Sequence, residues 1–251
     1  MQLLNEIIRT LPDGQVRAVH LGLHWTVVTI ETGGILRCGL SATLFTPHRH
    51  DQGPDIPGSG QLEFCSGLEL AELALSPHPT QASVGVAAIN ALLPRQAHMW
   101  SEDNAEEVIA RQGKGKRVVM VGRFPFVPRL RPRVGELQVL EQDPGPDDLP
   151  AHQAPEILPG AEVVAITGMT LINHSFEELL RLCPPEAFVI LLGPSTPLTP
   201  LLFDYGVDVL SGAVVTAIEP VVRIVSQGGN FRQVHRAGIR LVNMSKGWHL
   251  L

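Results

Sequence analysis

Residues that could bind a ligand follow four largely apolar runs in the second half of the chain. The runs cover residues 118–121, 137–140, 163–166 and 188–192. They are followed, in the same order, by Gly122 to Phe126, Glu141, Thr167 to Asn173, and Gly193 to Thr199. Such runs are typical of strands buried in a parallel sheet, where ligands bind beyond the carboxyl ends of the strands. We therefore expect Gly122, Glu141, Asn173 and Ser195 to face one shared hollow.

The polar groups in these loops suit a small ligand. Glu141 ends a strand in an apolar setting, as a carboxylate that binds a hydroxyl, an amine or a cation would. Thr167, Gly168 and Asn173 precede a helical segment, where free backbone N–H groups favour anions, and Ser195 could donate a hydrogen bond in the same way. Each residue also has a simpler interpretation, as a solvated strand-end acid for Glu141 and as turn or cap chemistry for the others.

The common nucleotide-binding motifs are missing from these loops. The first loop carries a single glycine, Gly122, followed by Phe124 and Pro125, whereas a dinucleotide fingerprint needs three glycines. NAD is therefore an improbable cofactor. The glycines and lysines of residues 113–116 precede a strand instead of following one, and no serine or threonine follows them. A phosphate-binding loop of the nucleoside triphosphatase type is thus excluded.

One group of metal-binding side chains is clustered in the sequence, namely His48, His50 and Asp51. Alternate residues of a loop can share a cation, although exposed polar loops often have the same composition. His174 stands beside the predicted hollow. No serine or cysteine has the sequence context of an activated nucleophile, which favours binding over catalysis. The identity of a cofactor, a transition metal included, stays open.

Crossover helices must connect the buried strands for their ends to meet. Ser175 and Glu178 have the spacing of a capping box, and an apolar stripe over 176–183 follows. Thr216 and Glu219 repeat the spacing before a second stripe that ends at Gly228 and Gly229. A last strand is expected at 239–242. Together these patterns predict a Rossmann-like, mostly parallel sheet.

The first half of the chain has a different pattern. Leucines and isoleucines at helical spacing predict a helix over 3–11, and β-rich runs over 16–23, 25–31 and 35–43 with short connections predict an antiparallel meander. Two helices should follow, one capped by Ser66 and Glu69 and one whose apolar stripe covers 84–92. Asp103 and Glu106 suggest the N-cap of another helix that ends near Gly113. The residues 46–60 between strands and helices are predicted to form a surface loop.

Composition limits the class of protein. The chain has 251 residues, of which 44% are hydrophobic and 18% charged, so a packed core and two domains are expected. The net charge of −6 argues against nucleic acid, and the basic residues within 114–133 are interpreted as a solvated rim. No apolar run is long enough to span a membrane, and three scattered cysteines fit a reducing compartment. We expect a cytoplasmic protein and leave open its assembly into a homo-oligomer.

The order of these loops resembles a bacterial and archaeal family described as putative heavy-metal chelation proteins. The resemblance rests on Gly122 to Phe124, Glu141, Thr167 to Asn173, Gly193 to Pro197, and Gly206 with Gly212. It implies an α+β domain similar to the enolase N-terminal fold over 1–100, a Rossmann-like domain over 101–251, and a ligand cleft between them. In the first half, the strand that ends at Thr43 and the helix that carries Asn90 match more loosely. Asn90 would face the cleft or satisfy a nearby carbonyl, because an unpaired amide in an apolar helix is costly.

Three hypotheses about function remain. The first is a protein that binds a metal or a metal complex through Glu141 and Asn173, with ligand contacts from Thr43, Asn90, Gly122, Phe124, Gly193 and their neighbours. The second is an enzyme acting on a small anionic metabolite, with Thr167, Gly168 and Ser195 binding the anion and Glu141 acting as acid or base. The third is a scaffold whose cleft is closed by another protein. We rank binding of a small molecule or metal above catalysis.

Overall fold

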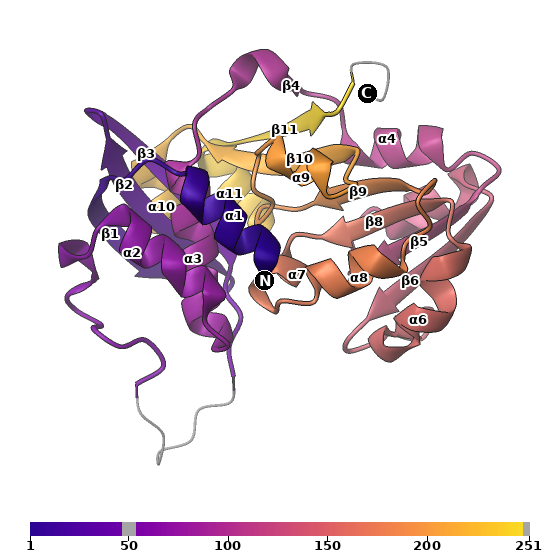
Figure 1. Ribbon diagram of the computed structural model, residues 1–251, viewed down its shortest axis with the longest axis horizontal. Helices are drawn as coiled ribbons and strands as arrows, with labels where there is room; N and C mark the ends of the chain where they lie inside the picture. The colour runs from indigo at the N-terminus through magenta and orange to yellow at the C-terminus, as the bar shows by residue number, and fades with distance from the viewer. Residues whose placement is uncertain (47–53, 248–251) are drawn as a thin grey trace.

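The computed structural model describes residues 1–46 and 54–247, which form two β-sheets with helices on their faces (Figure 1). The smaller sheet has three antiparallel strands, β1 (Gln15–Leu21), β2 (Trp25–Thr32) and β3 (Ile35–Ala42). Gly33 and Gly34, both with positive φ, form the two-residue turn between β2 and β3, as hairpins of this twist require. The predicted meander is confirmed.

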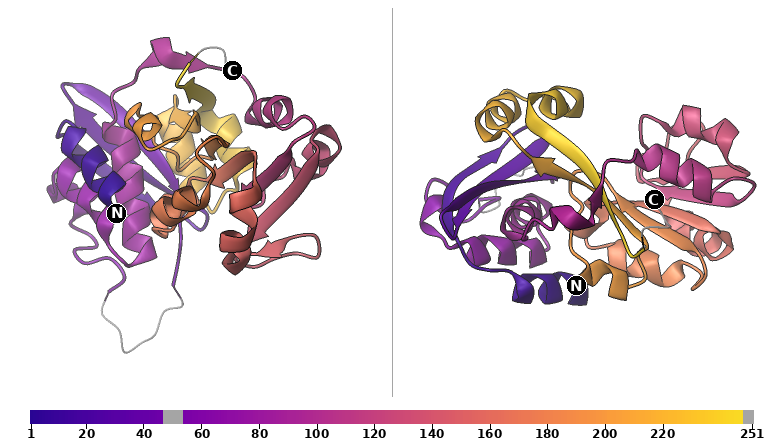
Figure 2. Two further views of the ribbon diagram at one scale, coloured as in Figure 1. Left: turned by 45° about the vertical axis from the view of Figure 1, so that its right-hand side comes forward. Right: turned by 90° about the horizontal axis from the view of Figure 1, so that it is seen from above.

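Helices from both ends of the chain cover the smaller sheet. One face packs on α2 (Gly67–Glu72) and α3 (Pro79–Leu92), against which Val28 and Ile30 point, while α1 (Gln2–Thr10) packs on α2 and the short helix after it. The other face carries Val27 and Leu40 and packs on α10 (Ile218–Ser226) and α11 (Phe231–Gly238). Figure 2 shows this arrangement in its right-hand view, with the late helices above the early strands. The smaller sheet therefore owes half of its cover to the end of the chain.

The larger sheet has eight strands among the described residues. In spatial order they are β4 (Trp100–Ser101), β11 (Ile239–Ser245), β10 (Val209–Val215), β9 (Phe188–Leu192), β8 (Val163–Thr167), β5 (Arg117–Val121), β6 (Glu136–Glu141) and β7 (Leu149–Pro150). The strands from β10 to β7 in this order are parallel. At one edge, β11 pairs antiparallel with β10, and β4 pairs antiparallel with β11. The predicted mostly parallel, Rossmann-like sheet is confirmed.

The order of connections reverses beside β5. The chain passes from β5 to its neighbour β6, and then returns to the other side of β5 to form β8. Strands β9 and β10 continue outward from β8. In open parallel sheets, a ligand crevice forms outside the carboxyl ends of the two strands where the winding reverses. The topology therefore places that crevice above Val121 and Thr167, the last residues of β5 and β8.

Two layers of helices bury the larger sheet. Its first face packs on α4 (Ala105–Gln112) and α5 (Val127–Leu130). Its second face packs on α6 (Ala154–Ile157), α7 (Met169–Ile172), α8 (Phe176–Leu182) and α9 (Leu201–Asp204). The core on the second face continues into the core beneath α1 and α3, so the two sheets share one hydrophobic cluster. Among the described residues, no helix is both long and apolar enough to cross a bilayer.

Several local predictions were wrong or incomplete. Asn104, and not Asp103, caps α4, because its side chain accepts a hydrogen bond from the Glu106 amide. Thr216 forms no capping box, since its hydroxyl donates instead to the Gly238 carbonyl. The sequence patterns also missed β10 and α11. The capping box of Ser66 and Glu69 at α2 is confirmed.

Candidate functional site

A cavity of about 420 Å³ lies at the carboxyl ends of β5, β6, β8 and β9, opposite the end of β3. Its lining includes eight of the ten residues singled out in the sequence, namely Gly122, Phe124, Glu141, Thr167, Gly168, Asn173, Gly193 and Ser195. Trp25, Ala42 and Leu44 close it from the side of the smaller sheet. Residues far apart in the sequence thus meet in one hollow because parallel strands end at one edge.

Glycines let the strand-end loops approach one another closely. Gly122 and Gly193 end their strands with φ of 97° and 112°, a region that favours glycine. A Cβ atom on Gly122 would lie 2.9 Å from the Cβ of Thr167, and one on Gly168 would lie 2.8 Å from the Thr196 nitrogen. The backbones of three neighbouring loops therefore form the floor of the cavity, with no room for larger residues.

The carboxylate of Glu141 is fixed at the rim of the cavity. One oxygen accepts a hydrogen bond from the Arg123 amide at 2.6 Å, and the other accepts one from the Gln142 amide at 3.0 Å. A carboxylate oxygen has two lone pairs, so each keeps an acceptor position for a ligand. The loop after β5 and the end of β6 thus jointly orient one acidic group toward the hollow.

Beside Glu141, Arg123 is paired with Asp148. The guanidinium donates to the Asp148 carboxylate, whose second oxygen accepts from the Gly145 amide at 3.0 Å. The hydrogen bond from Arg123 lowers the pKa of Asp148, and the same bond raises the pKa of Arg123. Glu141 also contributes to the raised pKa of Arg123 through its charge. The rim therefore contains one cation between two carboxylates.

Ser195 and Asn173 already have partners within the protein. The Ser195 hydroxyl is buried and accepts a hydrogen bond from the Ala42 amide at 2.8 Å, which ties β3 to the loop after β9. The Asn173 carbonyl accepts from the amide and the hydroxyl of Ser175 at 3.1 and 2.7 Å. Turn and junction chemistry therefore accounts for part of the role of each residue, while the Ser195 proton and the Asn173 amide group remain available as donors.

Thr43 and Asn90 do not line the main cavity. The Thr43 hydroxyl lies 2.9 Å from that of Thr26 inside the smaller sheet. The Asn90 amide donates to the Leu40 carbonyl at 2.9 Å and borders a separate cavity of about 30 Å³. This agrees with the simpler expectation for Asn90, a polar side chain that satisfies a backbone carbonyl.

His174 links the two halves of the structure instead of lining the cavity. Its φ of 62° is left-handed, which is costly for a residue with a Cβ atom. Its Nε2 atom lies 2.8 Å from the Ala74 carbonyl oxygen, which belongs to the short helix before α3. The histidines and the aspartate at positions 48, 50 and 51 lie outside the described residues.

The sequence patterns missed several lining residues. Trp25, His152 and Glu178 also border the cavity. Glu178 could have been found, because it lies with Ser175, Leu179 and Leu182 on one stripe of α8, and the whole stripe lines the cavity. Trp25 and His152 carried no such signal, since neither follows one of the four predicted strands.

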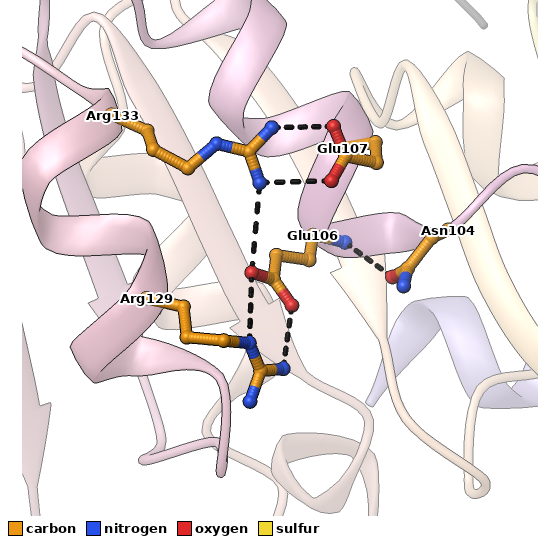
Figure 3. A network of polar contacts seen from close by, with 5 residues as sticks. All are labelled: Asn104, Glu106, Glu107, Arg129 and Arg133. Carbon is orange, nitrogen blue, oxygen red and sulfur yellow. Dashed lines mark hydrogen bonds and ion pairs between the residues drawn. The ribbon is translucent and has the colours of Figure 1, made fainter.

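A network of ion pairs holds the loop that carries Arg123 and Phe124 in place. The loop leads directly into α5, and Arg129 of α5 donates to the Glu106 carboxylate of α4 at 2.7 and 3.3 Å (Figure 3). Arg133 reaches both Glu106 and Glu107, and Asn104 caps the helix beneath them. Glu106 is 5% exposed, so its carboxylate is satisfied almost wholly by these arginines. The network joins α4 to α5 on the face of the sheet away from α8.

The side chains described here do not fit a bare heavy-metal ion. Over residues 1–46 and 54–247, no three histidine, cysteine, aspartate or glutamate side chains converge as a metal site requires. Burial raises the pKa of the Cys38 thiol to about 12 and that of Cys183 to about 11, which keeps both protonated at neutral pH. Soft metals bind thiolates, and no cysteine of the described chain lines the cavity.

Comparison with known proteins relates both halves of the chain to one description. The pattern of a family described as putative heavy-metal chelation matches residues 104–244, and a second pattern with the same description matches residues 4–93. An uncharacterized protein of Methanocaldococcus jannaschii is 26% identical over 226 residues, which are 86% of this chain and 85% of that protein.

Two solved structures share the whole fold. A protein of unknown function from Desulfitobacterium hafniense, of the family matched at 104–244, is 27% identical with a TM-score of 0.84 and covers 98% of both chains. A protein of unknown function from Pyrococcus horikoshii is 20% identical with a TM-score of 0.80, over 97% of this chain and 98% of its own. The second likeness concerns the fold alone.

Proposed function

The chain belongs to the family described as putative heavy-metal chelation, and on this premise we propose that it binds a small organic ligand, or a metal complex through its organic part, in the cavity between the two sheets. The observation that carries the proposal is the position of that cavity. It opens where the winding of the parallel sheet reverses, between the ends of β5 and β8. Ligands of doubly wound sheets bind at this point.

The walls of the cavity support an organic ligand. Apolar side chains contribute most of the lining, among them Trp25, Phe124, Leu140, Leu179 and Leu182. A few polar groups stand among them, chiefly Glu141 with its two backbone donors. Sites for small molecules are typically apolar hollows of 300–1,000 Å³ with few, fixed polar groups that set orientation. Both the volume and the composition of this cavity fall in that class.

A metal would then enter as part of the ligand. The described side chains provide no set of three metal donors and no thiolate at the cavity. A chelated metal arrives with most of its coordination positions filled, so the protein needs to recognise only the chelator. This reconciles the family description with the donors that line the hollow.

The proposal is tested by filling the cavity. In a thermal-shift screen with transition-metal chlorides, the citrate complexes of the same metals and a metabolite library, at least one compound should raise the melting temperature. The Ala151→Trp variant, at a partly exposed position of the lining, should abolish that shift. The matched control is Gln153→Trp in the same short helix, at a residue outside the lining, which should respond as the wild type does. Compounds that stabilise the Ala151→Trp variant as strongly as the wild type would contradict the proposal.

The second candidate is an enzyme that acts on a small anionic metabolite in the same cavity. One observation favours it, because Glu141, His152 and Glu178 all line the hollow and could exchange protons with a substrate. Any compound found in the screen can be incubated with the protein and followed by mass spectrometry. Conversion that is lost in Glu141→Gln would identify an enzyme, and an unchanged compound would identify a binding protein.

A further inference from the structure

We propose that the ligand is a ribonucleoside whose 2′- and 3′-hydroxyls donate hydrogen bonds to the Glu141 carboxylate. This inference rests on the proposed function and names the class of organic ligand that the cavity takes.

Glu141 lies at the end of the strand that follows the glycine turn of β5. Strand β5 ends in the left-handed turn at Gly122, and the next strand, β6, lies beside it and ends at Glu141, nineteen residues further on. In doubly wound sheets that bind nucleosides, an acidic residue about 20 residues beyond the glycine turn, at the end of the second strand, accepts a hydrogen bond from the ribose. Glu141 occupies the equivalent place in this sheet.

The Glu141 carboxylate offers hydrogen-bond acceptors that suit a pair of hydroxyls. The Arg123 and Gln142 amides hold one carboxylate oxygen each, so each oxygen keeps one lone pair for a ligand. An ionised carboxylate only accepts hydrogen bonds, and a pair of adjacent hydroxyls supplies two donors at matching separation. A cationic group is a poorer match, because the Arg123 guanidinium is close enough to Glu141 for the two charges to interact. The site therefore favours a neutral diol.

An apolar wall beside Glu141 suits the nucleobase. Glu141 pairs with Pro150 of β7, and the chain then turns into the short helix Ala151–Gln153 and α6. Leu140, Ala151, Ala154 and Pro155 consequently form an apolar wall of the cavity next to Glu141. A flat, weakly polar nucleobase is suited to such a wall, and its ribose would reach the carboxylate.

The loop after β5 disfavours a diphosphate. Where a dinucleotide site has its second and third glycines, this chain has Phe124 and Val127. The Phe124 ring stacks on Phe126 at 5.4 Å, and its edge lies 3.9 Å from the Cβ position of Gly193. The ring therefore covers the floor on which a pyrophosphate would lie. A nucleoside without phosphates should bind better than its 5′-diphosphate.

The test is isothermal titration calorimetry of the full chain with adenosine, guanosine, cytidine and uridine. At least one of them should bind. Its 2′-deoxy form should bind about tenfold more weakly or worse, because a hydrogen bond to a charged acceptor is lost. Its 5′-diphosphate should be weakened by a similar factor, because the Phe124 ring obstructs the diphosphate. The Glu141→Gln variant should bind the ribonucleoside more weakly than the wild type does, by a similar factor. It should bind the ribonucleoside no more tightly than it binds the deoxynucleoside. The control Glu136→Gln, the same substitution at the opposite end of β6, should bind as the wild type does.

Two results would overturn the inference. They are the absence of binding for all four ribonucleosides, and equal affinity for the ribo and deoxy forms. If Glu141→Gln fails to fold, the comparison of ribo with deoxy forms on the wild-type chain decides alone. A different ligand that is blocked by Ala151→Trp would leave the proposed function standing without the nucleoside, whereas the absence of any ligand blocked by that variant would remove both.

Discussion

Arg123 has two partners at the cavity rim, the backbone contact with Glu141 and the ion pair with Asp148. The Asp148 side chain is almost wholly covered, and Arg123 is held over it while its own amide orients Glu141. A change at Asp148 should therefore be felt in the geometry of Glu141. This makes Asp148 a positioning residue for the proposed site.

The pH dependence of stability should reveal the Asp148 ion pair. Because its pKa is lowered in the folded state, the stabilisation is fully present above the ordinary aspartate value of about 3.9 and is lost as the pH falls through the folded value. Urea unfolding from pH 8 to pH 2 should therefore show Asp148→Asn less stable than the wild type at neutral pH, with the difference shrinking as the pH falls below the ordinary aspartate value. Asp147→Asn, at an exposed neighbour, should show a much smaller difference. A difference in stability between Asp148→Asn and the wild type that is as large at pH 2 as at neutral pH would contradict the assignment.

His174 provides a test of backbone strain. His174→Gly removes both the left-handed strain and the hydrogen bond to Ala74, whereas His174→Ala removes only the hydrogen bond. The alanine variant should therefore be less stable than the glycine variant by about 1 kcal/mol. Denaturant unfolding of both variants measures this difference, and an alanine variant equal to or more stable than the glycine variant would count against it.

Much of the candidate site could be predicted at the level of single residues. Gly122, Glu141, Thr167, Gly168 and Gly193 follow buried strands, and the geometry of parallel sheets gathers strand ends without further information. Trp25 and His152 could not be found in this way, because their positions depend on how a second sheet and a short helix pack against those ends. Whether these residues bind a ligand stays a prediction.

Helix α3 is packed so tightly that its central glycine should not tolerate a methyl group. A Cβ atom on Gly85 would collide with the backbone of Ala74. Helix propensity alone predicts that Gly85→Ala stabilises the helix by about 1 kcal/mol, but overpacking should destabilise the protein by about 2 kcal/mol or more. Thermal or urea unfolding decides the sign, and a variant as stable as the wild type would refute the packing argument.

Strand β10, which the sequence patterns missed, has no continuous apolar run. In β10, Ser211 and Gly212 interrupt the apolar run, so the strand pattern is lost. A Cβ atom on Gly212 would lie 2.9 Å from Leu198, so the glycine is explained by a long-range contact that no local pattern contains. The confirmed strands β5, β8 and β9, by contrast, are apolar except for Arg117 and Thr167 at their ends, because both of their faces are buried.

At the scale of the whole molecule, we propose two domains, residues 1–100 and 101–251, that are interlocked. The family patterns at 4–93 and 104–244 support the division. Two features join the parts, the core shared by both sheets and the return of α10 and α11 to the smaller sheet, where Phe231 packs on Trp25 at 5.3 Å. The cavity lies at this junction, so its shape depends on both parts being folded.

Interlocking should make unfolding a single cooperative transition. Exposing the core beneath α3 would also expose one face of the larger sheet, so neither part can unfold alone without a large loss of buried apolar surface. Differential scanning calorimetry should give one peak whose calorimetric and van't Hoff enthalpies agree. Two resolved peaks, or a van't Hoff enthalpy well below the calorimetric one, would contradict the shared core.

Folding during synthesis on the ribosome depends on two contacts with later segments. These are the pairing of β4 with β11 and the cover that α10 and α11 give to the smaller sheet. Strands β1 to β3 precede in the sequence the helices that cover one of their faces, so those helices are translated well after them. Until then Val27 and Leu40 lack the helices that bury them, and the edge of β11 is not there for β4 to join. The nascent chain must therefore carry a half-covered sheet until α10 and α11 have been translated, a stage at which a chaperone that binds exposed apolar surface would recognise it.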